Sequence, residues 1–222
     1  MKRTNGWESI LRSAECRDVL AQIAALRKKG ERIYPIQKDV FRAFKDCPFE
    51  KVRVVILGQD PYAREGQAIG RAFAVPESTE KMPRSLKNIF EEVRRDYPHG
   101  DMPKRTLESW ARQRVFLLNT TLTVEDGRFN SHAKKIGWEK GVTIPTLEKL
   151  SAEREHLVFM LWGNHAKSFK QHILNQPRHL VLEASHPSPR SVKFFRKCGH
   201  FCEANNYLKK HGIEPIIWTN EP

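Results

Sequence analysis

The residues best suited to chemistry follow an apolar run in the stretch VVILGQDPYAREGQAIGRAF, positions 54–73. A glycine-containing loop after a strand often cradles phosphate, and an acidic residue is unexpected in such a loop. The P-loop pattern G-x-x-x-x-G-K-[ST] is absent, because Ala63 stands where the second glycine would be, counting from Gly58. The dinucleotide-binding pattern G-x-G-x-x-G is absent as well. Asp60, at the first bend of the loop, therefore indicates chemistry other than phosphate binding.

Three further segments place polar residues directly after apolar runs: LLNTTLTV, WGNH and SHPSPRS. Each residue alone has an ordinary structural explanation. Asp60 before a proline could cap a helix, Asn119 could form a turn, and His186 could be a satisfied loop histidine. Their occurrence at the ends of four runs instead favours one shared site. Its candidate residues are Gln59, Asp60, Tyr62, Asn119, Asn164, His186 and Ser188.

The apolar runs themselves predict the elements that position these residues. Each run is short, rich in strand-forming residues and bounded by turn residues, which is typical of buried parallel strands. Helical patterns separate the runs, so we expect an α/β fold: a central, twisted, four-stranded parallel sheet flanked by helices on both faces. In such sheets the site lies beyond the carboxyl ends of the strands. The predicted strands cover residues 52–58, 114–119, 156–163 and 179–185.

Four stretches carry apolar residues at helical spacing. Gly30 is a plausible stop for the first, and Ser85 is a plausible N-cap for the second. No internal repeat or long linker interrupts the chain, so we expect a single domain over residues 1–222, with residues 1–30 as an N-terminal helical segment packed on it. The predicted helices cover residues 16–26, 86–97, 169–174 and 201–208.

The chain is strongly basic. Its 39 Lys and Arg residues against 26 Asp and Glu residues give a formal net charge of +13. A pI of about 9.8 favours a polyanionic partner, most simply nucleic acid, although a basic surface without such a partner is the alternative. The run HPSPRSVKFFRK contains hydroxyls and four cations and no carboxylate, which suits contact with a phosphate backbone. A solvated basic loop is the alternative for this segment.

No stretch approaches the roughly 18 apolar residues of a membrane span, and the N-terminus lacks the apolar region of a signal peptide. We therefore expect a cytoplasmic protein whose four cysteines are reduced thiols. The segment CGHFC, with Cys198 and Cys202, is interpreted as two thiols on a helix face, because no second ligand pair stands at metal-site spacing. A metal or cluster there is the alternative.

Several motifs, in the same order along the chain, resemble those of the family 1 uracil-DNA glycosylases. GQDPYAREGQAIGRAFAV is similar to the family's GQDPYH followed by GQAxGLxFSV, and LLNTTLTV is similar to LLNxxLTV. LVFMLWGNHA resembles LLWGSxA, SHPSPRS resembles HPSPLS, and MPRSLKNIFEEV resembles the proline-serine loop PPSLxNIYKEL. IYPIQKDVFRAF and NSHAKKIGW also resemble family segments. The likeness extends from about residue 33 to 218.

This resemblance implies a DNA repair enzyme that flips deoxyuridine out of DNA and hydrolyses its N-glycosidic bond, without metal or cofactor. Asp60 would stabilise the cationic sugar and orient or activate water, and His186 would donate a hydrogen bond to uracil O2. Asn119 would read the edge of the base, Tyr62 would exclude the methyl group of thymine, and Phe73 would stack on the base. The residues expected to contact DNA are Ser85, Gly163, Asn164, Ser188, Arg190 and Ser191.

The resemblance also implies the partners. These are uracil-containing DNA, single- and double-stranded, and protein inhibitors that mimic DNA. A monomer is expected, and no membrane partner. Gln59 is expected to contribute mainly through its backbone.

The chain departs from the family pattern at three places. The histidine that follows Pro-Tyr in the family, and that helps to hold the attacking water there, is Ala63. We still expect activity, because electrostatic stabilisation is usually the larger effect. The leucine wedge of HPSPLS is Arg190, which is expected to fill the space of the flipped nucleotide, the alternative being a phosphate contact only. The serine of WGS is Asn164, which can still bind phosphate.

Three other function classes compete with this interpretation. An inactive DNA-binding scaffold or processivity factor is disfavoured by the intact Asp60, Asn119 and His186. A glycosylase with an iron–sulfur cluster needs four clustered cysteines, and Cys16 and Cys47 do not have that spacing. An unrelated nucleotide-binding α/β enzyme is disfavoured by the missing phosphate motifs.

Overall fold

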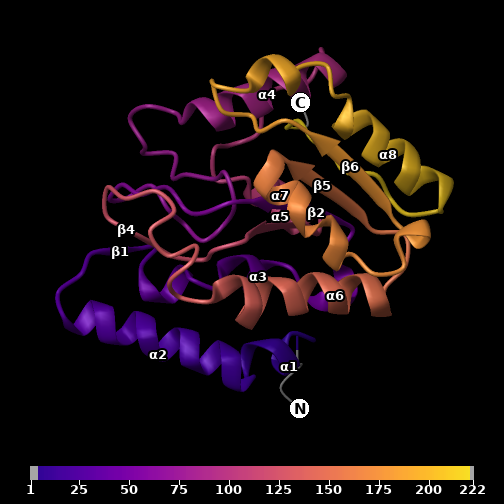
Figure 1. Cartoon of the computed structure of the whole chain (residues 1–222). Helices are drawn as coiled ribbons and strands as arrows, with labels where there is room; N and C mark the ends of the chain where they lie inside the picture. The colour runs from indigo at the N-terminus through magenta and orange to yellow at the C-terminus, as the bar shows by residue number, and fades with distance from the viewer. Residues whose placement is uncertain (1–4, 221–222) are drawn as a thin grey trace.

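The computed structural model describes residues 5–220, which form a layered α/β fold around one parallel sheet (Figure 1). The strand order is β3-β2-β5-β6, and every pairing in this sheet is parallel. The predicted four-stranded parallel sheet is therefore confirmed. Its strands are β2 (Val54–Gly58), β3 (Val115–Asn119), β5 (Val158–Trp162) and β6 (Leu180–Ala184).

The helices and two further short strands surround this sheet. β1 (Ile33–Tyr34) and β4 (Val124–Glu125) form a separate antiparallel pair. The α-helices are α1 (Glu8–Leu11), α2 (Ala14–Lys28), α3 (Arg42–Asp46), α4 (Arg84–Asp96), α5 (Glu108–Arg112), α6 (Ile144–Glu153), α7 (Asn164–Ser168) and α8 (His200–Lys210). Short 3-10 turns span Gln37–Asp39, Phe49–Lys51, Phe169–His172, Gln176–Arg178 and Val192–Phe194, and a π-helical turn, η3, spans Glu139–Thr143.

Strands β2, β3 and β5 are buried at every position because helices cover both faces of the sheet. Successive side chains alternate between the faces, as strand geometry requires. Val55 and Leu57 join a core with α2, α3 and α6, whereas Val54 and Ile56 join a core with α4, α5 and α8. Figure 1 shows α2, α3 and α6 on one side of the sheet and α4 and α8 on the other.

The register of the sheet aligns the carboxyl ends of its strands. Gly58 of β2 pairs with Asn119 of β3, and Trp162 of β5 pairs with Ala184 of β6. The loops that follow these four residues therefore leave the sheet at the same edge. This is the edge at which the sequence predicts the site.

The predicted helices are confirmed in part. In α2 the Ser13 hydroxyl accepts the Cys16 N–H at 3.0 Å, and the helix ends just before Gly30, whose φ is +89°. The expectation that Ser85 is the N-cap of the next helix is wrong. The helix α4 begins at Arg84, Pro83 is its N-cap, and Ser85 is already its second residue. The expected helix over residues 169–174 is only a 3-10 turn that ends at His172.

The cysteines of CGHFC do not share a helix face as expected. Cys202 lies in α8, but Cys198 lies outside this helix. It precedes Gly199, which is the N-cap of α8 and has a positive φ of +65°. His200, between them, accepts a hydrogen bond on Nδ1 from the Trp162 indole N–H at 3.0 Å. Within residues 5–220, no three His, Cys, Asp or Glu side chains group as a metal site would need.

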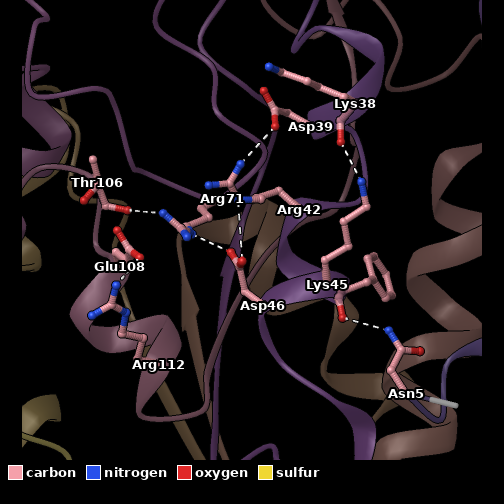
Figure 2. A network of polar contacts seen from close by, with 11 residues as sticks. Asn5, Lys38, Asp39, Arg42, Lys45, Asp46, Arg71, Thr106, Glu108 and Arg112 are labelled. Carbon is pink, nitrogen blue, oxygen red and sulfur yellow. Dashed lines mark hydrogen bonds and ion pairs between the residues drawn. The ribbon is translucent and has the colours of Figure 1, made fainter. Parts of the chain in front are cut away.

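The loop after β2 is fastened to the body of the protein through a buried arginine. Arg71 is only 6% exposed; its Nε donates to Asp46 Oδ2 at 2.6 Å, and its Nη1 donates to the Thr106 carbonyl at 3.0 Å (Figure 2). The adjacent Gly70, at φ +78°, packs so closely on the Asp39 carbonyl that a Cβ would overlap it. Removing one partner of such a buried pair typically costs about 3–5 kcal/mol. The network thereby fixes the segment that carries Phe73.

Across residues 5–220, none of the helices combines the length and the apolar composition that a membrane crossing requires.

Candidate active site

A pocket of about 630 Å³ lies at the carboxyl edge of the sheet, lined by residues at or after the ends of β2, β3, β4 and β6 and by Ser85 of α4. Of the twelve residues predicted to form the site, nine line this pocket and three do not. Its lining residues are Gln59, Asp60, Pro61, Tyr62, Phe73, Ser85, Asn119, Phe129, Asn130, His186, Ser188, Pro189 and Arg190.

Asn119 lies at the deep end of the pocket, where β3 stops. The residue is 7% exposed, and Gly58 on the neighbouring strand makes room for it, because a Cβ at Gly58 would overlap Asn119 Oδ1. No group within residues 5–220 forms a hydrogen bond with the Asn119 amide. An unpaired amide that is nearly buried is costly, so its donor and acceptor are available to a ligand that matches them.

Phe73 and Tyr62 form an aromatic surface next to Asn119. Phe73 adopts a positive φ of +64°, and its ring centroid lies 5.6 Å from Trp162 and 6.0 Å from His186. The Tyr62 hydroxyl donates to the Phe73 carbonyl at 3.2 Å, which ties the two residues together. Burial raises the pKa of Tyr62, so this hydroxyl stays protonated at neutral pH. The hydrogen bond and the ring contacts thus hold two aromatic side chains next to each other in the pocket lining.

Asp60 directs its carboxylate into the pocket from the first turn after β2. Its Oδ2 accepts the Asn130 N–H at 2.8 Å, and the Gln59 side chain donates to Asn130 Oδ1 at 2.7 Å. Burial raises the pKa of Asp60, while the Asn130 N–H and the charge of His165 oppose the rise. The opposing contacts favour the ionised carboxylate in a partly dry pocket.

The geometry around His186 fixes its tautomer. The Ser188 N–H donates to Nδ1 at 3.0 Å, so in the neutral ring the hydrogen is on Nε2. Burial lowers the pKa of His186, which favours this neutral form at pH 7. Gly163, at φ +92°, allows the ring to approach, since a Cβ there would lie 2.8 Å from His186 Cβ. His186 is thus a neutral hydrogen-bond donor.

The residues predicted to contact DNA lie at different places. Ser85, Ser188 and Arg190 line the pocket. Ser191 lies just outside it, where its hydroxyl donates to the His186 carbonyl at 2.7 Å and so braces the loop. Gly163 supports His186 from behind, and Asn164 is exposed at the first residue of α7.

Three residues near the pocket were missed by the sequence analysis. Asn130 belongs to NSHAKKIGW, whose likeness to the family was a signal that could have identified it. Phe129 is 65% exposed at the mouth of the pocket, and only its position in space marks it. His165, in the segment WGNHA, contacts Thr120 beside the site. Ala63 is fully buried, and its carbonyl accepts the Gly127 N–H at 2.7 Å.

Comparisons with known proteins agree on one family. Residues 44–209 match the family model described as uracil DNA glycosylase superfamily. The uracil-DNA glycosylase of Haemophilus influenzae is 50% identical over 202 residues, covering 90% of this chain and 90% of the relative. That of Actinobacillus succinogenes is 46% identical over 202 residues, covering 90% of this chain and 89% of the relative.

Solved structures give the same result. The crystal structure of mimivirus uracil-DNA glycosylase superposes with a TM-score of 0.86 at 27% identity, covering 96% of this chain and 85% of that chain. A mimivirus UNG variant in complex with UGI superposes with a TM-score of 0.87 at 28% identity, with the same coverage.

Proposed function

We propose that this chain, which belongs to the uracil DNA glycosylase superfamily, carries out its reaction with Asp60 and His186 as catalytic residues. The reaction is hydrolysis of the N-glycosidic bond of deoxyuridine in DNA, a base excision repair step that releases uracil and leaves an abasic site. The observation that carries the assignment is the convergence of Asp60, Asn119 and His186 on one pocket.

Asp60 acts on the sugar. As the glycosidic bond breaks, the deoxyribose becomes cationic, and a carboxylate beside it lowers the energy of that state. The Asn130 N–H holds one carboxylate oxygen, which supports a fixed orientation before DNA arrives. The ionised carboxylate also orients the water that attacks the sugar.

His186 acts on the leaving group. The departing uracil becomes an anion, and a donor aimed at its O2 stabilises the charge as an oxyanion hole does. A neutral ring with hydrogen on Nε2 supplies that donor, and the Ser188 contact supports this tautomer. Neutral His186 and ionised Asp60 thus act on opposite charges of the same transition state.

Asn119, Tyr62 and Phe73 select the base. The Asn119 amide donates to uracil O4 and accepts from N3–H, whereas cytosine presents the opposite pattern at both atoms. A buried site of this kind can discriminate by ~10⁴ or more, because the wrong base leaves polar groups unpaired. Tyr62 occupies the space that the thymine methyl would need, and Phe73 stacks on the flipped ring. Gln59 contributes through its backbone.

The exposed residues around the pocket hold the DNA. Hydroxyl groups and backbone N–H groups bind phosphate oxygens, while Arg190 enters the space that the flipped nucleotide leaves. Phe129, an exposed aromatic residue of the pocket lining, stacks on an unpaired neighbouring base. The phosphate-binding residues are Ser85, Gly163, Asn164, Ser188 and Ser191.

The functional unit is a monomer with one domain, acting on single- and double-stranded DNA. Trp7, Val19 and Ile23 from the N-terminal helices belong to the same buried core as β2 and β3, which supports one unit. The mimivirus UNG variant was solved in complex with UGI, and we extend this to an inhibitor that mimics DNA and covers the same mouth.

The test is uracil release from a defined oligonucleotide in EDTA, comparing the wild type with Asp60→Asn. This substitution keeps the size of the side chain and removes its charge, so we expect the single-turnover rate to fall ~10²-fold or more. Asp18→Asn, an exposed change on α2, serves as the control and leaves the rate unchanged. An Asp60→Asn variant as fast as the wild type would refute the assignment. A wild type that releases no uracil would favour the scaffold alternative.

A further inference from the structure

A second pocket, of about 540 Å³, adjoins the first and shares Gln59, Phe129 and Asn130 with it. Its inner end is formed by His165 from α7 and Glu139 from η3. The catalytic proposal assigns no role to either residue. Both are about two-thirds buried, with side chains 33% and 28% exposed.

Hydrogen bonds connect His165 to the backbone next to Asp60. His165 Nε2 lies 2.9 Å from the hydroxyl of the fully buried Thr120, and that hydroxyl donates to the Gln59 carbonyl at 2.8 Å. A hydroxyl has one hydrogen, and here the carbonyl takes it. Thr120 must therefore accept from His165, which places a hydrogen on Nε2.

The Gln59 carbonyl is held twice, since the Thr121 N–H also donates to it at 3.0 Å. This carbonyl belongs to the peptide that joins Gln59 to Asp60. The orientation of that peptide determines where the Asp60 side chain leaves the backbone. Loss of the His165 contact would therefore change the orientation of the Asp60 carboxylate, although two hydrogen bonds separate His165 from the Gln59–Asp60 peptide.

His165 also lies close to a carboxylate. Glu139 Oε1 lies 3.2 Å from His165 Nε2, and this Glu139 atom is buried with no aligned hydrogen bond from any residue between 5 and 220. The Nε2 hydrogen points toward Thr120, so Glu139 is a close neighbour of His165 and not its hydrogen-bond acceptor. Positive charge on His165 also lowers the pKa of Asp60. Without His165, Asp60 would lose this contribution to its ionised form, and the buried Glu139 Oε1 would lose its neighbour.

Other charged groups line the second pocket together with His165. They come from the end of β4 and the loop that follows it, and are Glu125, Arg128, Lys134 and Lys135. Arg128 is neutralised by Glu125 at 3.0 Å. The phenyl ring of Phe169 packs beside His165, with the ring centroids 5.5 Å apart.

We propose that His165 is a positioning residue for catalysis: through Thr120 it fixes the Gln59–Asp60 backbone from which the catalytic carboxylate extends. This inference rests on the proposed role of Asp60. It explains how the carboxylate is oriented in a chain whose position 63 is a fully buried alanine.

The test compares His165→Leu with His165→Gln in single-turnover uracil release. Leucine removes the donor and the charge, so the maximal rate falls about tenfold or more while the half-saturating enzyme concentration is unchanged. Glutamine restores a donor to Thr120 and recovers part of the rate. In both variants the acidic limb of the pH–rate profile moves to higher pH, because Asp60 loses a positive neighbour and its pKa rises.

His172→Leu is the matched control. His172 also pairs with a glutamate, Glu148, at 3.1 Å, but away from the pocket, so its loss leaves the rate and the pH profile unchanged.

Thermal unfolding of each variant is measured in parallel. If His165→Leu does not fold, the pH–rate profile of His165→Gln tests the inference in its place. An unchanged rate and acidic limb in a folded His165 variant, with Asp60→Asn still inactive, would overturn this inference alone. An active Asp60→Asn would instead overturn the proposed function.

Discussion

Two sides of the pocket are built differently. The base wall is formed by Tyr62, Phe73 and Asn119. Asn119 is the last residue of β3, and Tyr62 and Phe73 pack against the buried core. The DNA rim, formed by Phe129, Ser188 and Arg190, lies on loops, and Phe129 and Arg190 are exposed. The groups that we propose bind the base therefore stand at the buried end of the sheet. The groups that we propose contact DNA stand on surface loops, which are generally more mobile and more variable.

The largest effect is expected from the deepest residue of the base wall. Asn119→Ala removes the amide that reads the base, and uracil release should fall ~10²- to 10³-fold, because a buried contact to the leaving group is lost. Single-turnover rates measure this. Asn206→Ala, exposed on α8, is the control and has no effect. A mere twofold loss for Asn119→Ala would mean that the wall does not read the base.

The second prediction concerns the buried pair of Arg71 and Asp46, which holds the segment that carries Phe73. Asp46→Ala leaves Arg71 buried without its partner, so the free energy of unfolding should fall by about 3 kcal/mol, measured by urea denaturation. Asp126→Ala breaks an exposed pair with Arg32 at 3.9 Å and should cost less than about 1 kcal/mol. Equal losses in the two variants would show that Arg71 does not depend on Asp46.

On the rim, Arg190→Ala should affect duplex DNA more than single-stranded DNA. A residue that fills the space of a flipped nucleotide matters only where a stack must be kept open, so we expect about a tenfold loss on duplex and little on single strands. Lys193→Ala, in the same loop, should weaken both substrates equally, since phosphate contacts do not depend on pairing. An equal loss for Arg190→Ala would reduce it to a phosphate contact.

The smallest effect is expected at Phe129. Loss of base stacking in Phe129→Ala should raise the half-saturating concentration on single-stranded DNA about fivefold, with the maximal rate preserved. Ile217→Ala, an exposed apolar change at the amino edge of the sheet, is the control. A drop in the maximal rate of Phe129→Ala would show that this residue acts with the base wall and not only as a DNA contact.

Sequence reasoning predicted the sheet and the meeting of three polar residues at its carboxyl edge for a physical reason. Buried parallel strands are continuous apolar runs, and their carboxyl ends must meet at one edge, so Asp60, Asn119 and His186 could be brought together without coordinates. The helix α6 was missed although Pro145 at its start and the spacing of Leu147 and Leu150 were available signals.

Other features depend on packing between distant segments. Arg71 reaches Asp46, 25 positions away, and His165 reaches Thr120 across 45 positions. Neither pair has a local pattern that marks it, because the contacts are made by the fold and not by the spacing. The capping role expected of Ser85 failed for a local reason, since the helix already begins at Arg84 with Pro83 as its N-cap.

The central claim is that the pocket keeps Asp60 ionised and His186 neutral, and the pH dependence of the single-turnover rate tests it most directly. Burial raises the pKa of Asp60 and lowers that of His186, and both groups must be deprotonated to act. The rate should therefore be flat around neutral pH and fall at least tenfold per pH unit in acid. A rate that rises on acidification would require a charged His186 or a protonated Asp60, and would contradict the account.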